Sequence, residues 1–224
     1  MLKKAICELF GTFFIIFLSL SAIELNVLNS TIGTLGIALV FGFSTLIMFA
    51  IFLRISKSHF NPAISFTMFI MGEINIKELA VYIVSQFIGG MLAGLLLTML
   101  FGKSMSYTLV TINQYLISQS DIPSYFFIII VEFIGSFIVM FTYKYSINNK
   151  KVGALYIGGI IFILVLIFYN ITGSGLNIIR IIVPSIYNLK FDNVIFYIIG
   201  ILFGTLTGGL CYHQIMEKKS KKGD

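Results

Sequence analysis

Asn61 is the residue whose type and setting most clearly suit the binding of a small polar solute. It heads a short apolar stretch within the sequence His59-Phe60-Asn61-Pro62-Ala63. Asparagine is a strong helix N-cap, and a proline at the first helical position gives up only an amide that has no partner there. A helix is therefore predicted to begin at Asn61. Its positive dipole end and the Asn61 side-chain amide can then donate to a solute oxygen such as that of water.

A second asparagine, Asn177, heads a comparable stretch with the sequence Asn177-Ile178-Ile179-Arg180. Asn177 can cap a helix in the same way. Ile178 and Ile179 are bulkier than a proline and an alanine at these places, and Ile178 carries an amide that proline lacks. The two segments agree in their asparagines and differ in the two residues that follow.

Chemistry beyond binding is not indicated. The sequence contains no metal-ligand cluster, nucleotide-binding loop or catalytic triad, so neither an enzyme nor a cofactor is predicted. His59 is either a pH sensor or a fixed hydrogen-bonding partner beside Asn61, and we favour the second role. Cys7 and Cys211 are predicted to be inert packing residues.

The elements that position these residues follow from composition. Apolar residues make up 58% of the chain and charged residues only 11%, with a mean hydropathy of +1.01, which excludes an ordinary soluble globule. The apolar residues form blocks of about 20, the length that crosses a hydrocarbon core about 30 Å thick. Six spans are predicted, at about 5–23, 33–53, 77–101, 123–145, 153–170 and 193–214. Stretches 61–70 and 177–187 are about half as long, so we expect re-entrant half-helices there.

An internal repeat relates the two halves of the chain. The segment from Cys7 to Phe13 returns as Val131 to Phe137, with Glu, a Gly three residues on, a hydroxyl residue and then Phe. An intramembrane carboxylate is either an ion or proton site or an acceptor of hydrogen bonds. The symmetric setting of Glu8 and Glu132 favours acceptors that hold the loops leading to the half-helices.

Each copy has an odd number of spans, so the repeat must be inverted. The predicted halves are about 1–105 and 122–217 of a single channel domain, 1–224, which ends in a basic tail, 218–224. We pair Gly90 and Gly94 of the third span with Gly204 and Gly208 of the sixth as small residues at helix contacts. Paired interrupted segments in inverted halves indicate a transport site near the bilayer midplane.

These residues resemble the aquaporin and glycerol-facilitator family, also called the major intrinsic proteins. The resemblance rests on His-Phe-Asn-Pro-Ala with its upstream Glu-x-x-Gly-Thr, and it runs over nearly the whole chain. The family's second motif, Asn-Pro-Ala-Arg, is matched here by Asn177 and Arg180 but not by Ile178 and Ile179. The resemblance implies an all-α membrane protein with six transmembrane helices and two half-helices, assembled as a homotetramer with one pore in each subunit.

Carried over by position, the family's narrowest constriction falls on Phe41, Val165, Ser174 and Arg180. Water-selective members have a His at the place of Val165. Glycerol-passing members have an aromatic residue at the Ser174 position and an Asp after the Arg, where this chain has Ile181. Arg180 is either a surface charge or, as we favour, a cationic donor that repels cations at the pore mouth.

The charges indicate orientation rather than nucleic-acid binding. Twelve of the fifteen Lys and Arg residues fall on one side of the predicted spans, which places both termini in the cytoplasm. These are Lys3, Lys4, Arg54, Lys57, Lys77, Lys144, Lys150, Lys151, Lys218, Lys219, Lys221 and Lys222. The predicted location is a plasma or inner membrane, with lipid, water and small uncharged solutes as partners.

Three functions are weighed. The first is a passive channel for water and small neutral solutes such as glycerol. The second is an ion-coupled secondary transporter, which needs Glu8 or Glu132 to face the pathway and titrate. The third is a non-conducting structural protein in which Ile178 and Ile179 plug the midplane.

Overall fold

Six long apolar helices dominate the computed structural model, which describes residues 1–30, 32–102 and 107–217. They are α1 (Leu2–Asn29), α2 (Gly33–Ser56), α4 (Ile76–Phe101), α6 (Ser124–Asn148), α7 (Gly153–Thr172) and α9 (Val194–Tyr212). Each is long and apolar enough to cross a bilayer. The predicted fold class, an all-α membrane protein with six spans and two half-helices in an inverted repeat, is confirmed.

The two half-helices are α3 (Pro62–Ile70) and α8 (Ile178–Asn188). With 9 and 11 residues at 1.5 Å each, they reach about 14 Å and about 17 Å, roughly half of a hydrocarbon core. Asn61 and Asn177 are their N-caps, each with an extended backbone and a side chain that accepts from the amide two residues on. Both helices begin where the local chemistry predicts.

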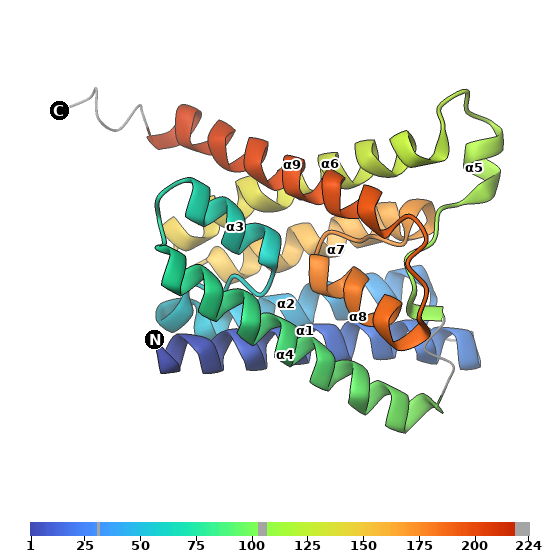
Figure 1. Ribbon diagram of the computed structural model, residues 1–224, viewed down its shortest axis with the longest axis horizontal. Coiled ribbons are helices and arrows are strands. Elements are labelled where there is room, and N and C mark those ends of the chain that lie inside the picture. The colour runs from blue at the N-terminus through green and yellow to red at the C-terminus, as the bar shows by residue number, and fades with distance from the viewer. Residues whose placement is uncertain (31, 103–106, 218–224) are drawn as a thin grey trace.

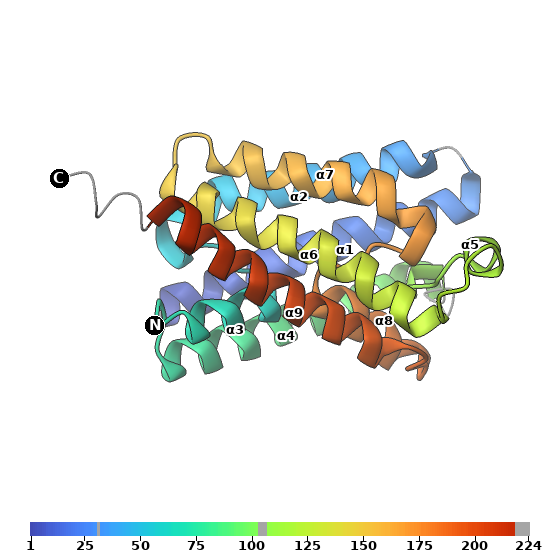
Figure 2. The ribbon, with the colours of Figure 1, turned by 90° about the horizontal axis from the view of Figure 1, so that it is seen from above.

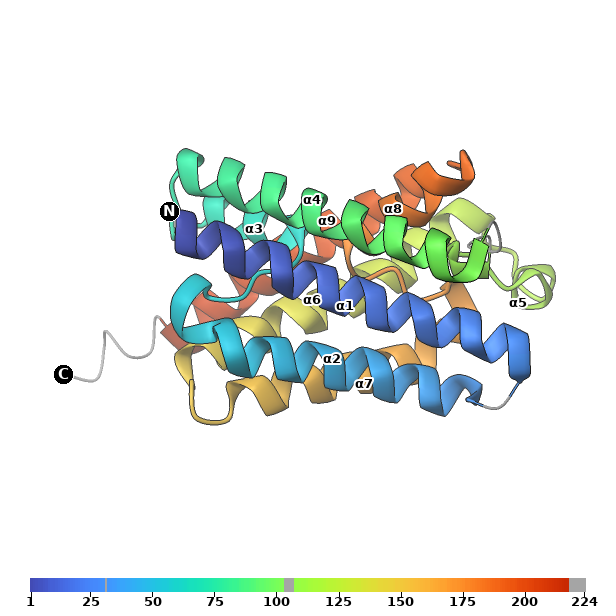
Figure 3. The ribbon, with the colours of Figure 1, turned by 90° about the horizontal axis from the view of Figure 1, so that it is seen from below.

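The long helices pack as neighbouring pairs around the two short ones. Helix α1 lies against α2 and α4, and α6 lies against α7 and α9, while α2 and α7 join the two halves (Figure 2 and Figure 3). Figure 1 shows α3 towards the end of the bundle that holds the start of α1, and α8 towards the opposite end. The half-helices therefore enter from opposite faces, as an inverted repeat requires.

Glycines allow α1 and α6 to approach their partners closely. A Cβ on Gly89 of α4 would lie 2.3 Å from the carbonyl oxygen of Leu9, and one on Gly204 of α9 would lie 2.4 Å from that of Phe133. Gly89 is thus the counterpart of Gly204. The predicted pairing of Gly90 with Gly204 is wrong by one residue, because the contact that α4 makes with α1 determines the register and the spacing of small residues does not.

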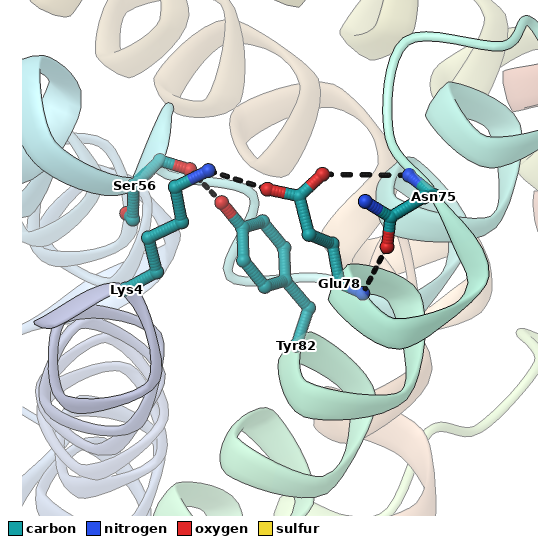
Figure 4. A network of polar contacts seen from close by, with 5 residues as sticks. All are labelled: Lys4, Ser56, Asn75, Glu78 and Tyr82. Carbon is teal, nitrogen blue, oxygen red and sulfur yellow. Dashed lines mark hydrogen bonds and ion pairs between the residues drawn. The ribbon is translucent and has the colours of Figure 1, made fainter. Parts of the chain in front are cut away.

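A polar network ties together the ends of α1, α2 and α4 (Figure 4). Asn75 caps α4 in a capping box with Glu78, whose carboxylate also pairs with Lys4 at 2.5 Å. The Tyr82 hydroxyl donates to the carbonyl oxygen of Ser56 at 2.6 Å. This bond anchors the residue from which the chain leaves α2 for the first half-helix.

Two short elements and one partly buried ion pair were not expected. Helix α5 (Gln114–Ser118) lies in the connection between the halves, and a π-helical turn, η2 (His213–Glu217), continues α9. Lys144, predicted as an orienting charge, is 2% exposed and pairs with Glu73. The predicted tail, 218–224, and Lys103 lie outside the described residues.

Candidate functional site

The loops that lead into the half-helices share an unusual backbone. Ser58 and Phe60 have φ of 54° and 48°, and Ser174 and Leu176 both have φ of 51°. Each left-handed non-glycine residue costs on the order of 1–3 kcal/mol unless its surroundings hold it in place. The same alternation in both loops shows that one strained conformation is used twice.

Glu8 of α1 holds the first loop. Its two carboxylate oxygens accept hydrogen bonds from the backbone amides of His59 at 3.0 Å and Phe60 at 2.7 Å. The Gln86 side-chain amide of α4 donates a third, at 2.8 Å. Charge-assisted bonds of this kind are stronger than neutral ones and can offset the cost of the strained loop.

Glu132 of α6 holds the second loop in the same manner. It accepts from the amides of Gly175 at 3.0 Å and Leu176 at 2.8 Å, and from the Thr172 hydroxyl at 2.7 Å. Gly175 is required here, because a Cβ would lie 2.8 Å from a Glu132 carboxylate oxygen. Glu8 and Glu132 are therefore each engaged by the loop beside them.

Hydrogen bonds from the capping asparagines join the N-terminal ends of the two half-helices. The Asn61 side-chain amide donates to the carbonyl oxygen of Leu176, and that of Asn177 donates to the carbonyl oxygen of Phe60, both at 2.9 Å. An asparagine amide has two N–H groups, so each keeps one beyond this bond. Each capping asparagine therefore has an N–H group in addition to the one that binds the opposite loop.

Ile178 and Ile179 point into packed surroundings. Ile179 is 1% exposed and lies against α4, where a Cβ on Gly90 would be 2.2 Å from its Cγ2 atom. Ile178 packs with Ala63 of α3 in an apolar cluster, and its amide lies 3.5 Å from the Asn61 side-chain oxygen. The bulk of both residues is accommodated in the protein interior.

A cavity of about 60 Å³ runs beside the two asparagines. A cavity needs about 10–15 Å³ of such space to hold a water molecule, so this one is large enough for water. Four long helices, both half-helices and both loops line it: Ile15, Ile16, Ser19, Phe41, Thr45, Phe49, His59, Phe60, Asn61, Ile64, Val139, Ile157, Ile161, Val165, Ser174, Gly175, Leu176, Asn177 and Arg180. The walls are mainly apolar, with a few polar groups, as is usual for a small-molecule pathway.

All four residues predicted to form the constriction line this cavity. Phe41 comes from α2, Val165 from α7, Ser174 from the second loop and Arg180 from α8, and each is at most 6% exposed. Arg180 is 2% exposed and donates to the carbonyl oxygens of Thr108 at 2.5 Å and Gly173 at 3.4 Å. It therefore does not extend to the surface.

One ring nitrogen of the buried His59 has a hydrogen-bond partner, and the other has none among the described residues. Its Nδ1 atom lies 2.9 Å from the Ser65 hydroxyl, which also accepts from Gln86 at 3.0 Å. Its ring packs edge-on against Tyr82, with the ring centres 4.6 Å apart. The Nε2 atom has no hydrogen-bond partner among the described residues.

Three further cavity residues present buried polar atoms that find no partner in the described part of the chain. They are the hydroxyls of Ser19 and Ser174 and the Nε atom of Arg180. Buried polar groups are nearly always hydrogen-bonded, so these atoms are available to a solute in the cavity. Ser19 and Gln86 were not among the predicted site residues, although a polar residue inside a predicted span is itself a signal.

Comparisons with known proteins agree with this architecture. Residues 1–212 match the major intrinsic protein family. Aquaporin NIP1-1 of Zea mays is 28% identical over 219 residues, 96% of this chain and 75% of that protein. Putative aquaporin NIP4-1 of Arabidopsis thaliana is 30% identical over 218 residues, 95% of this chain and 74% of that protein.

Among solved structures, the aquaglyceroporin from Plasmodium falciparum has a TM-score of 0.78 at 16% identity, covering 99% of this chain and 98% of that one. This likeness shows a shared fold. Because the family match covers residues 1–212 of 224, the chain belongs to the major intrinsic protein family of transmembrane channels.

Proposed function

We propose that this protein is a passive channel that carries water and small neutral solutes such as glycerol. The observation that supports this most is the single cavity shared by Asn61, Asn177 and the four constriction residues. Its polar groups without protein partners can hydrogen-bond a passing solute, while its apolar walls leave that solute free to move on. Arg180 is the one charged residue among the described residues that line it, which disfavours cations.

Glycerol is proposed because of Val165. A His at this place would add bulk and a ring that hydrogen-bonds, whereas Val165 makes the constriction wider and more apolar. An apolar wall costs water some hydrogen bonds but can contact the carbon backbone of a polyol. Ile181, which replaces the Asp of glycerol-passing members, is fully buried and absent from the lining, so it does not narrow the cavity.

Ion-coupled transport is disfavoured by the places of the two carboxylates. Glu8 and Glu132 are absent from the cavity lining, and their oxygens accept the loop amides. A coupling carboxylate has to release its partners and face the pathway in order to titrate. Opening either carboxylate to the cavity would free a strained loop.

A structural role without conduction is disfavoured by the packing of Ile178 and Ile179. Both are at least 91% buried and neither lines the cavity.

The resemblance to the family also supports a homotetramer in a plasma or inner membrane, with both termini in the cytoplasm.

Stopped-flow measurements on proteoliposomes test the channel. We expect wild-type vesicles to shrink faster than empty ones in both a water and a glycerol assay. Val165→Trp should return shrinkage to the empty-vesicle rate, because position 165 is fully buried beside the cavity. Ile163→Trp, on the same helix but 46% exposed, is the matched control and should conduct normally.

Two outcomes contradict the proposal. Wild-type shrinkage equal to that of empty vesicles indicates a structural protein. Uphill solute accumulation driven by a proton or sodium gradient indicates a coupled transporter.

A further inference from the structure

Ser19 of α1 is a buried residue on the cavity wall whose hydroxyl has no partner among the described residues. It is 1% exposed, it lines the cavity, and its Oγ atom has no hydrogen-bond partner among the described residues. Helical Ser and Thr residues commonly donate to the carbonyl four residues back. Thr45 and Ser185 do so in this protein, at 2.9 Å each. The Ser19 hydroxyl is thus a buried group without the usual internal bond.

The surroundings of Ser19 suit a solute that both donates and accepts hydrogen bonds. The same cavity holds the unpartnered Ser174 hydroxyl and Arg180 Nε atom. An arginine can only donate, whereas a serine hydroxyl can donate and accept. A solute hydroxyl can therefore accept from Arg180 and donate to a serine, and two serines suit a solute with more than one hydroxyl.

The internal repeat shows that this arrangement belongs to one half only. Ser19 follows Glu8 by eleven residues, and the residue eleven after Glu132 is Tyr143. The Tyr143 hydroxyl donates to the carbonyl oxygen of Lys57 at 3.0 Å, so it is engaged. At the position equivalent to Ser19, the described second half therefore has no free hydroxyl.

We propose that Ser19 is a further selectivity residue, contributed by α1, whose hydroxyl hydrogen-bonds small polyhydroxylated, uncharged solutes as they pass Ser174 and Arg180. This inference rests on the proposed channel function. A site with buried groups that require solute hydroxyls discriminates against solutes without them, because those groups are otherwise left unpaired.

Removal of the hydroxyl tests the selectivity. Ser19→Ala should lower the ratio of glycerol to water permeability about three- to tenfold, the effect of one lost neutral hydrogen bond. Ser21→Ala is the matched control, since Ser21 is also on α1 with a buried, unpartnered hydroxyl but does not line the cavity. Its ratio should equal that of the wild type. An unchanged ratio in a monodisperse Ser19→Ala preparation that conducts water overturns the proposal.

A thiol at the same position tests the location independently of the solute. Ser19→Cys should lose water flux on treatment with a mercurial and recover it with excess thiol, while the wild type and Ser21→Cys should not. Absence of block in a Ser19→Cys protein that conducts water refutes a place for Ser19 on the pathway. A wild type that conducts water but no glycerol refutes the proposed solute, and the block then decides separately whether Ser19 lines the path.

Discussion

At the scale of single residues, the cavity combines a few polar atoms with apolar walls. Each capping asparagine donates one side-chain N–H to a carbonyl oxygen of the opposite loop. The ring of His59 is oriented by its hydrogen bond with Ser65. These groups are fixed before a solute arrives, so little ordering is needed when it binds. The constriction residues are proposed to act through their charge and size. Substitution of Arg180 tests the charge, and substitution of Val165 tests the size.

The charge of Arg180 is expected to exclude cations more than it supports water flow. Arg180→Val should raise proton or small-cation conductance by at least about tenfold, because one unit charge at a partly desolvated site contributes a barrier of several kcal/mol. Liposome flux with a pH-sensitive dye measures this. Lys190→Val, which removes an exposed charge, is the control. Unchanged ion conductance in a folded, water-conducting Arg180→Val protein removes Arg180 from the filter.

The size of Val165 is expected to set the solute limit. Val165→His should reduce glycerol flux about tenfold and spare much of the water flux, because the ring narrows an apolar aperture but can still exchange hydrogen bonds with water. Paired stopped-flow assays give both rates. Equal loss of the two fluxes indicates misfolding or blockage, and no loss of either places the restriction elsewhere along the cavity.

At the scale of elements, each half-helix depends on a span from its own half and one from the other. The loop before α3 is held by Glu8 of α1, and the loop before α8 by Glu132 of α6. Helix α8 then packs on α4 of the first half, where Gly90 and Gly94 leave room for it. The unusual second motif is thus accommodated by a small residue on another helix.

This contact predicts that a larger residue at position 90 destabilises the protein, and that a smaller residue at position 179 restores stability. Gly90→Ala should destabilise the protein by about 1–3 kcal/mol, because its Cβ would lie 2.2 Å from Ile179 Cγ2. The double variant Gly90→Ala, Ile179→Ala should recover much of the loss, since the smaller side chain vacates that space. Thermal unfolding in detergent, followed by size-exclusion chromatography, measures the difference.

Gly159 provides the matched control, because a Cβ there meets no atom within 4 Å. Gly159→Ala should be neutral or stabilise α7 by up to about 1 kcal/mol, the helix-propensity difference. If Gly90→Ala is as stable as Gly159→Ala, α8 does not pack on α4 as described.

At the scale of the whole molecule, the distribution of charge makes the two ends of the bundle chemically different. The start of α1 and the end of α9 lie at one end, and α5 lies at the other (Figure 1). Most of the basic residues in the described chain lie at the first end, so the positive-inside bias predicts that this end faces the cytoplasm.

Cysteine labelling tests this orientation. Ser118 of α5 and Lys150 between α6 and α7 are both exposed, at opposite ends of the bundle. In intact cells, a membrane-impermeant maleimide should label Ser118→Cys and leave Lys150→Cys unlabelled until the cells are opened. The opposite pattern places the termini outside.

The six long helices and the two half-helices could be predicted from the sequence, because their causes are local or compositional. Span lengths follow from bilayer thickness, and α3 and α8 begin at Asn61 and Asn177 because of N-cap chemistry. Phe41 and Val165 were identified by family resemblance alone, since an α-helix that is apolar on all sides carries no signal for the face that lines a cavity.

The helix faces that contact one another became known from the tertiary structure. It showed that Ile178 and Ile179 pack away from the cavity, that Gly89 is the residue that matches Gly204, and that Ser19 contributes a free hydroxyl. Each of these depends on contacts between helices far apart in the chain, where a rotation or a shift of one residue changes the partner without changing the hydrophobic pattern.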